Sequence, residues 1–273
     1  MIPTKPTYGA IAATICGDAG MGKTTLAASF PAPVFIRVED GMQSLGANAP
    51  DAFPVLNKFE DILPQLAWLI NQPHQFKTVV IDSVTALERM AIDYVIAMDD
   101  KKPKSINQAM GGYGAGFSAV AGLHQRVRTA AKRLNEKGIN VVFLAHCDTE
   151  TLDLPDSEPY QRWVLRMNKK SVAPYVDDVD LVGFIKLRTV TIGDDDRKKA
   201  VSDGTRVLVT YATAANISKN RFGISADLVV EAGKNPLLKY IPSLSKPTPP
   251  VVVEPQPQST VEEPTATDEG ESS

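Results

Sequence analysis

One octapeptide constrains this chain more than any other feature. Residues Gly17–Thr24 read Gly-Asp-Ala-Gly-Met-Gly-Lys-Thr, which fits the pattern G-x-x-x-x-G-K-[ST]. The octapeptide follows an apolar run, Ile11–Ile15, and opens a short helical segment, Lys23–Phe30, that Pro31 ends. A glycine-rich loop between a strand and a helix points backbone N–H groups and the helix N-terminus at a phosphate group. The pattern therefore predicts a nucleoside triphosphate site rather than a flexible turn.

The individual residues of this loop have different expected roles. Lys23 is expected to reach the β- and γ-phosphate oxygens, and the Thr24 hydroxyl is expected to bind Mg²⁺. The rest of the loop and the residue after it are expected to contact the nucleotide: Gly17, Asp18, Ala19, Gly20, Met21, Gly22 and Thr25.

Such a site also needs a carboxylate at the end of a buried strand, to hold the shell of the Mg²⁺ ion. The run Thr78–Asp82 supplies one, because Asp82 stands where the apolar residues stop. A strand-ending Asp is also a common helix N-cap, and Ser83 could share that task. The combination with the glycine-rich loop favours the Mg²⁺ role for Asp82.

Hydrolysis requires a further group that orients the attacking water, and two adjacent acids are candidates. Glu39 and Asp40 follow the apolar run Val34–Val38. Because side chains alternate along a strand, we expect one of the two to point into the site. The alternative is a pair of solvated acids in a turn.

Apolar β-branched runs alternate with helical patterns through the first half of the chain, which predicts an α/β fold with a mostly parallel central sheet. From Tyr160 onward the pattern becomes extended, and an antiparallel extension of the same sheet is expected. The predicted strands are Ile11–Ile15, Val34–Val38, Val79–Ile81 and Ile139–Ala145, the predicted helices are Phe59–Asn71, Val84–Met98 and Phe117–Lys137, and the later extended segments are Trp163–Met167, Leu181–Leu187 and Val207–Tyr211.

The net charge of −3 averages two different regions. Residues 246–273 carry six acids, one base and six prolines without periodicity, which predicts a disordered tail. Residues 1–245 are then the folded domain, with a net charge of +2 that leaves nucleic acid open as a partner. No apolar stretch approaches the roughly 18 residues of a membrane span. Cys16 and Cys147 lack metal-ligand or disulfide-framework spacing, so we expect two buried thiols in a cytoplasmic protein.

Three segments resemble RecA-type ATPases. The strand that ends in Asp82-Ser83-Val84 is similar to the metal-binding strand of RecA. Phe35–Asp40 resembles the RecA segment whose strand-ending glutamate positions the attacking water, and this resemblance assigns that role to Glu39 rather than Asp40. Val142–His146 resembles the next core strand, which in RecA ends in a glutamine that senses the γ-phosphate. His146 stands at that position here. A histidine can donate the same hydrogen bond, or it can be a structural residue at the end of a strand.

A more distant segment makes the resemblance more specific. Lys219–Gly223 reads Lys-Asn-Arg-Phe-Gly and resembles a signature of RadA-like and related RecA-core ATPases. The resemblance implies that Lys219 and Arg221 reach the ATP of a neighbouring subunit, although such a sequence can also be a solvated basic turn. The whole pattern most resembles phage-encoded RecA-like ATPases of the single-strand annealing recombinase group. It implies an oligomeric Mg²⁺-dependent ATPase that acts on single-stranded DNA in recombination or annealing, with a single-strand-binding protein as a possible partner.

Two loops of RecA-like proteins face DNA, and the corresponding stretches here are 99–116 and 147–173. Each stretch combines basic side chains, which could bind phosphates, with an aromatic side chain that could stack on an unpaired nucleotide base. Lys169 and Lys170 are equally compatible with contact to a neighbouring nucleotide, and each stretch can also be an ordinary solvated loop. The candidates are Lys101, Lys102, Lys104 and Tyr113 in the first stretch, and Arg162, Trp163, Arg166, Lys169 and Lys170 in the second.

Two rival functions remain open at this point. A P-loop kinase would pass phosphate to a small acceptor, and a nucleotide-switched scaffold or loader would bind ATP with little turnover. The acidic tail is either a solubilising extension or a competitor with DNA phosphates for the basic loops.

Overall fold

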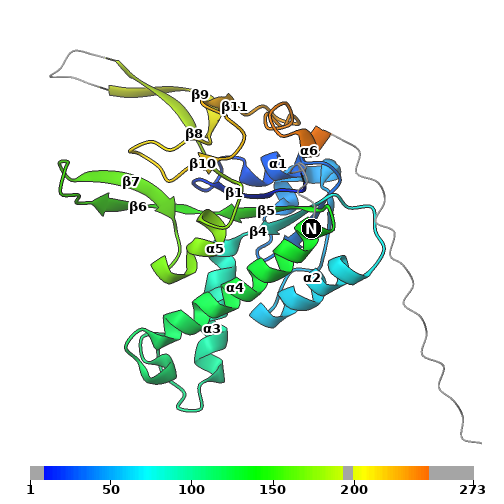
Figure 1. The fold of residues 1–273 in the computed structure, drawn as a ribbon, viewed down its shortest axis with the longest axis vertical. Helices are drawn as coiled ribbons and strands as arrows, with labels where there is room; N and C mark the ends of the chain where they lie inside the picture. Colours follow the sequence, from blue (N-terminus) through cyan, green and yellow to red (C-terminus); the bar gives the residue numbers. More distant parts are fainter. Residues whose placement is uncertain (1–8, 193–198, 246–273) are drawn as a thin grey trace, which may run out of the picture.

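We describe the fold from a computed structural model that defines residues 9–192 and 199–245. The predicted tail, 246–273, lies outside the described residues. Helices and strands alternate along the first half of the chain and pack in layers around one sheet (Figure 1). The predicted α/β fold class is confirmed.

Nine strands of the described chain form the main sheet, in the order β11-β9-β8-β1-β5-β4-β2-β3, with β10 paired to β8. The six strands from β8 to β3 run parallel, whereas β9, β10 and β11 are antiparallel to their neighbours. The bounds are β1 Ala12–Cys16, β2 Pro33–Arg37, β3 Asp51–Ala52, β4 Thr78–Asp82, β5 Asn140–Ala145, β8 Leu181–Ile192, β9 Lys199–Val209, β10 Lys219–Asn220 and β11 Leu228–Val229.

Helices cover both faces of this sheet, and every residue of β1, β4 and β5 is therefore buried. Alternate residues of one strand pack against opposite layers: Val79 and Ile81 contact the layer of α2 to α5, and Val80 contacts the layer of α1 and α6. This double burial explains the continuous apolar runs in the sequence. The bounds are α1 Lys23–Ala28, α2 Ile62–Asn71, α3 Val84–Met98, α4 Ala115–Glu136, α5 Ala173–Val176 and α6 Pro242–Ser245, with 3-10 helices at Met42–Asn48, Phe59–Asp61, Ala109–Gly111 and Lys169–Ser171.

Local signals set the limits of the long helices. The Ser83 hydroxyl accepts a hydrogen bond from the Ala86 N–H, so that it caps the start of α3. α4 ends at Glu136, and Gly138 follows with a φ of 81°, a conformation that glycine adopts without strain. The predicted helices Val84–Met98 and Phe117–Lys137 agree with α3 and α4 to within two residues at each end, whereas the first three residues of the predicted helix Phe59–Asn71 form a 3-10 helix before α2.

The second half of the chain differs from the prediction in two ways. Trp163–Met167 does not extend the main sheet, because β7 (Tyr160–Leu165) pairs with β6 (Cys147–Leu152) in a separate two-stranded sheet. β8 was expected to be antiparallel but runs parallel to β1. The chain between β7 and β8 returns to the end of the sheet where β1 begins, since the Asp180 N–H bonds to the Ala12 carbonyl.

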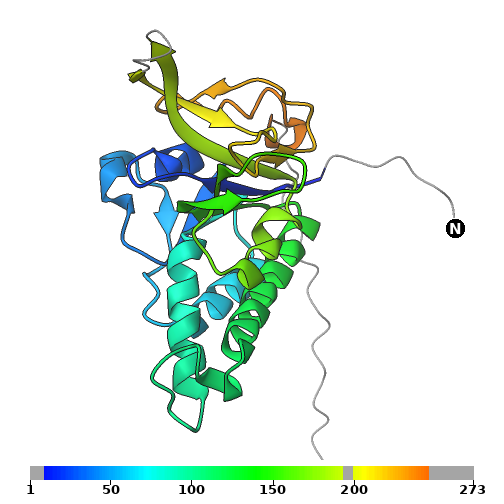
Figure 2. The same ribbon diagram turned by 90° about the vertical axis from the view of Figure 1, so that its left-hand side faces the viewer.

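Three segments project from one side of the molecule: the β8–β9 hairpin, the β6–β7 hairpin and the connection between α3 and α4 (Figure 1). Figure 2, which turns this side toward the viewer, shows the three segments one above the other. The stretches 99–116 and 147–173, proposed as DNA loops, are therefore the lower two of these projections. No helix in the described residues is long and apolar enough to cross a membrane.

Candidate nucleotide-binding site

The glycine-rich loop connects β1 to α1 and turns sharply at two glycines. Gly20 and Gly22 have φ values of 75° and 88°, which residues with a Cβ atom rarely adopt. Gly17 is needed for a different reason, because a Cβ atom there would lie 2.6 Å from the backbone oxygen of Ile185 on β8. The loop is therefore packed directly against the neighbouring strand.

Lys23 lies in the loop, largely buried, with its ammonium group turned toward the loop backbone. Its Nζ donates to the carbonyl oxygens of Gly17 and Asp18, at 2.9 Å each. Burial lowers the pKa of the Lys23 ammonium, and the Asp82 carboxylate acts in the opposite direction. The charge is thus held in a site with little water, where its attraction for an incoming phosphate is strong.

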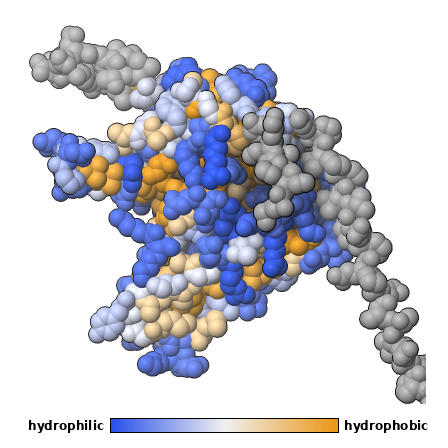
Figure 3. All heavy atoms as spheres, in the orientation of Figure 1, coloured by the Kyte–Doolittle hydropathy of each residue, from blue (hydrophilic) through white to orange (hydrophobic). Residues whose placement is uncertain are grey.

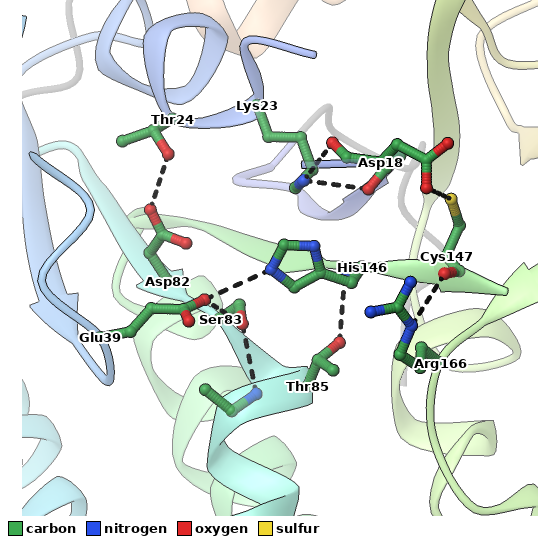
Figure 4. Close-up of polar contacts among 12 residues, drawn as sticks. Asp18, Lys23, Thr24, Glu39, Asp82, Ser83, Thr85, His146, Cys147 and Arg166 are labelled. Atoms are coloured by element: carbon green, nitrogen blue, oxygen red, sulfur yellow. Dashed lines mark hydrogen bonds and ion pairs between the residues drawn. The ribbon is translucent and has the colours of Figure 1, made fainter. Parts of the chain in front are cut away.

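Asp82 is the last residue of β4 and faces the start of α1. Its Oδ2 accepts a hydrogen bond from the Thr24 hydroxyl at 2.9 Å (Figure 4). Burial raises the pKa of the Asp82 carboxyl, while the bond from Thr24 acts in the opposite direction. The two oxygens proposed for the Mg²⁺ shell are therefore adjacent.

Glu39 belongs to a hydrogen-bonded group beside Asp82 (Figure 4). The Ser83 hydroxyl donates to Glu39 Oε1 at 2.8 Å, and His146 Nε2 lies 3.5 Å from the same oxygen. The bond from His146 is the main reason that the pKa of Glu39 falls to about 2. Glu39 is therefore ionised at neutral pH, and its carboxylate oxygens can accept hydrogen bonds from water.

The position of Asp40 differs from what the sequence predicted. The sequence predicted that one of the two adjacent acids would face the site, but both Glu39 and Asp40 line the same cavity. The reason is that β2 ends at Arg37, so the alternation of a strand does not extend to them. Asp40 is exposed and pairs with Arg37 at 3.4 Å, which leaves Glu39 as the acid that contacts Ser83 and His146.

These groups surround a cavity of about 450 Å³ at the carboxyl ends of the parallel strands. Of the predicted loop contacts, Gly17, Asp18 and Met21 are not part of the lining: Met21 packs in the apolar core, and the Asp18 carboxylate accepts a hydrogen bond from the Cys147 thiol at 3.3 Å. The lining residues are Ala19, Gly20, Gly22, Lys23, Thr24, Thr25, Glu39, Asp40, Gly41, Ser44, Asp82, His146 and Arg206.

The residues fit a nucleotide with Mg²⁺. No cluster of three or more His, Cys, Asp or Glu side chains in the described ranges could hold a metal by itself. The Thr24 hydroxyl and the Asp82 carboxylate offer hard oxygen ligands, and Mg²⁺ usually completes its shell with phosphate oxygens and water. The site therefore fits a metal that arrives with its nucleotide.

Three residues contribute to the site although no sequence motif identified them. The Thr85 hydroxyl accepts from the His146 backbone N–H at 3.0 Å, and the Cys147 thiol binds Asp18. Burial raises the pKa of Cys147 to about 12, so this thiol is inert, as its apolar neighbours in the sequence suggested. The third is Arg206, an arginine in β9 whose position beside the loop depends on sheet pairing that the sequence does not reveal.

Lys219 and Arg221 lie outside this cavity. The Lys219 ammonium donates to the Asp177 carbonyl at 2.8 Å, and Arg221 pairs with Asp180 at 3.1 Å, with most of its side chain exposed. Neither group therefore reaches the nucleotide site of its own chain, and a role at a neighbouring subunit stays a prediction.

The structure separates the DNA candidates into free and bonded groups. Lys101, Lys102, Lys104 and Tyr113 are exposed on the connection between α3 and α4. Arg166 is exposed after β7, but its Nε donates to the Cys147 carbonyl at 3.1 Å. Lys170 links the two projections, because its Nζ donates to the Gly114 carbonyl at 3.0 Å and to the Ser118 hydroxyl at 2.9 Å. Arg162 and Lys169 both pair with Glu150, at 2.8 and 3.3 Å.

Trp163 corrects another expectation. Its ring stacks on Phe184 of the main sheet, with 5.4 Å between the ring centroids, and its backbone N–H bonds to the Ala215 carbonyl. The ring is therefore packed against the core and is not free to stack on a base.

A parallel sheet, a glycine-rich loop that opens α1 and an acid at the end of β4 together define a P-loop NTPase. Residues 10–222 match the AAA domain family. The match spans more than half of the chain, and the chain therefore belongs to the AAA domain family. No curated protein matches the chain closely enough to count as a relative. The family indicates a nucleotide-binding domain of the ATPase type, and the narrower RecA-like identity remains a proposal.

Proposed function

We propose that this chain is a RecA-like, Mg²⁺-dependent ATPase that acts as a homo-oligomer on single-stranded DNA in phage-type recombination or annealing. The observation that carries the proposal is the arrangement of Glu39 beside Asp82 and Thr24 around one cavity. On this proposal residues 1–245 are the catalytic domain, and the protein works in the cytoplasm, that of the host if a phage encodes it.

The proposed chemistry assigns one task to each group. Lys23 and the loop N–H groups bind the β- and γ-phosphates, and Glu39 orients a water molecule and accepts its proton. Mg²⁺ bound by Thr24 and Asp82 would neutralise charge on the phosphate oxygens. His146 lies 3.5 Å from Glu39, so it would support the position of that carboxylate. The γ-phosphate sensor role of His146 follows from the resemblance to RecA and is part of the proposal.

A chain of contacts supports a connection between this site and DNA. His146 in the cavity accepts a backbone hydrogen bond from Arg166 at 2.9 Å, and the Arg166 side chain donates to the Cys147 carbonyl at 3.1 Å. Lys170, four residues later, holds the connection that carries Lys101, Lys102, Lys104 and Tyr113. Phosphate-binding cations and an exposed aromatic ring suit a single strand.

The surface positions of Lys219 and Arg221 support assembly. A cation that a neighbouring subunit supplies can stabilise charge on the transferred phosphoryl group. Such a contact makes the site incomplete in one chain, so activity should depend on protein concentration.

The test is the rate of ATP hydrolysis with and without single-stranded DNA, across a range of protein concentrations. The proposal predicts stimulation by DNA and a specific activity that rises with concentration. A turnover rate that depends on neither single-stranded DNA nor protein concentration would contradict the proposal. Mixing Lys23→Ala with Arg221→Ala protein, each inactive alone, should partly restore activity if neighbouring subunits share sites.

A further inference from the structure

The nucleotide cavity contains an arginine that no motif contributes. Arg206 comes from β9, and its Nη2 lies 3.4 Å from the carbonyl oxygen of Gly20 in the glycine-rich loop. Its other terminal nitrogen, Nη1, lies 3.4 Å from the position that a Cβ atom on Gly22 would take. The guanidinium group therefore lies beside the segment Gly20–Gly22 and lines the cavity with it.

The backbone of Arg206 is fixed on both sides. In the sheet it pairs with Leu187 of β8, and its carbonyl accepts a hydrogen bond from the Val230 N–H at 2.9 Å. The residues that follow, Val207 and Leu208, are buried. Because Gly17 packs against Ile185 of the same hairpin, the hairpin and the loop cannot separate without breaking close contacts. The sheet thus fixes the backbone of Arg206 near the loop, while its side chain is exposed.

The charged groups that line the cavity indicate what Arg206 could bind. Three carboxylates, Glu39, Asp40 and Asp82, line the cavity, and the cations of the described lining are Lys23, Arg206 and, when protonated, His146. Glu39 and Asp82 have partners in the site, whereas no acid in the described residues pairs with Arg206. Its bond to a neutral carbonyl at 3.4 Å is near the limit for a hydrogen bond, so a phosphate oxygen would be a stronger acceptor.

We propose that Arg206 binds the phosphate chain of the nucleotide within its own subunit, at the β-phosphate. The inference rests on the proposed nucleotide binding and adds a cation that acts in cis. The β-phosphate is favoured because the backbone N–H groups of a glycine-rich loop cradle the α- and β-phosphates, and Arg206 lies beside this loop. Lys219 and Arg221 are bonded elsewhere in the same chain, so they do not supply this charge.

The proposed role of Arg206 can be distinguished by experiment from two others: a cation that a neighbouring subunit supplies, and a group that senses the γ-phosphate. A group that binds the β-phosphate contributes equally to ATP and ADP. A group that acts on the transferred phosphoryl affects ATP turnover and leaves ADP affinity unchanged. Comparing the two nucleotides therefore identifies which phosphate Arg206 binds.

The experiment compares the full-length protein with Arg206→Gln, Arg206→Lys and the matched control Arg188→Gln. Arg188 is exposed on β8 of the same hairpin and does not line the cavity. Calorimetric titration gives the Kd of ATP and of ADP with Mg²⁺, and thermal unfolding without nucleotide reports on the fold. Arg206→Gln should raise both Kd values about tenfold, the loss of one charge-assisted hydrogen bond. Arg206→Lys should recover part of the affinity, and Arg188→Gln should bind as the unchanged protein does.

Several outcomes would overturn the inference. Equal affinity in Arg206→Gln and the unchanged protein removes Arg206 from the site. A loss confined to ATP reassigns it to the γ-phosphate. If Arg206→Lys binds as weakly as Arg206→Gln, and both unfold earlier without nucleotide, Arg206 only fastens the hairpin to the loop. Failure of the unchanged protein to bind either nucleotide would instead contradict the proposed function.

Discussion

Two cavities of this molecule are built in different ways. The nucleotide cavity is polar, and its groups are bonded to one another through short contacts such as Thr24–Asp82 and Ser83–Glu39. The second cavity, of about 630 Å³, lies beside the β6–β7 hairpin and joins apolar residues to charged ones. Figure 3 shows an indented surface between that hairpin and the connection of α3 to α4. The lining is Glu88, Asp148, Thr149, Glu150, Arg162, Val164, Leu165, Arg166, Met167, Lys169, Val172, Val176 and Ile217.

The nucleotide cavity also differs from the exposed connection between α3 and α4 in how many of its charged groups are bonded within the chain. Lys23, Asp82 and Glu39 all have partners and are pre-oriented for one ligand. On the projections, Lys101, Lys102 and Lys104 are exposed, and no ion pair holds them in the described chain. A rigid polar site suits chemistry at one atom, whereas exposed cations suit a long polyanion that contacts them in many ways. The predictions below test whether the two regions have these separate tasks.

The largest effect should come from Asp82→Asn. It removes the carboxylate proposed for the Mg²⁺ shell, and ATP turnover should fall by at least about 100-fold, because a charge that stabilises the transition state is lost. Phosphate release measures this, with Asp93→Asn on the exposed side of α3 as the control. Binding to single-stranded DNA without nucleotide should remain. If that binding fell equally, the two regions would be one site.

Glu39→Gln should lower turnover by about 100-fold, because the amide cannot accept the proton of the attacking water. ATP affinity should change little, which a binding titration of the same protein checks. Asp40→Asn is the matched comparison, and a smaller loss is expected because Asp40 contacts neither Ser83 nor His146. Equal losses would show that the two acids share the task.

The folding stability of the protein should decrease in acid because of a histidine buried in α4, one of the helices that support the projections. His124 is buried in α4, its Nδ1 lies 2.7 Å from the Tyr175 hydroxyl, and burial lowers its pKa from 6.5 to about 4. Between these pH values the unfolded chain binds a proton that the folded chain excludes. Stability should therefore fall as the pH drops from 6.5 to 4, by about 3 kcal/mol for this group.

Urea unfolding at pH 7 and pH 4.5 measures this effect in the unchanged protein and in His124→Gln. The glutamine cannot take up a proton, so the variant should lose less stability between the two pH values. Identical pH dependence in both proteins would show that His124 is not the titrating group.

The smallest effect should come from replacing Lys101, Lys102 and Lys104 together by glutamine. The affinity for single-stranded DNA should fall about tenfold, and the slope of log K against log salt should decrease by about 2, as expected for three phosphate contacts. Fluorescence anisotropy with a labelled oligonucleotide measures both. Replacing the exposed Lys58, Lys132 and Lys137 is the control. Equal losses would indicate general charge attraction rather than a site on this projection.

Sequence reasoning predicted the buried core strands β1, β2, β4 and β5 and the long helices, because burial on two faces gives a continuous apolar run and burial on one face gives a helical period. The short strands β3, β10 and β11 and the strand β6 were not predicted. Sequence reasoning also predicted that Lys23, Thr24 and Asp82 lie together, because the loop after β1 leads to Lys23 and Thr24 at the same edge of the sheet where β4 ends at Asp82. It failed for the direction of β8, because an apolar run does not reveal which end of the sheet the chain enters. Arg206 was missed for a related reason: its distance from the loop is set by pairing between strands far apart in the sequence.

One residue, His146, separates the main sheet from the outlying hairpin, since β5 ends at Ala145 and β6 begins at Cys147. Its N–H is bonded to Thr85 and its carbonyl to Arg166, so both sides of this junction are held. One residue therefore belongs to both regions: the His146 side chain lines the nucleotide cavity, and its backbone carbonyl is bonded to the strand end of the outlying hairpin.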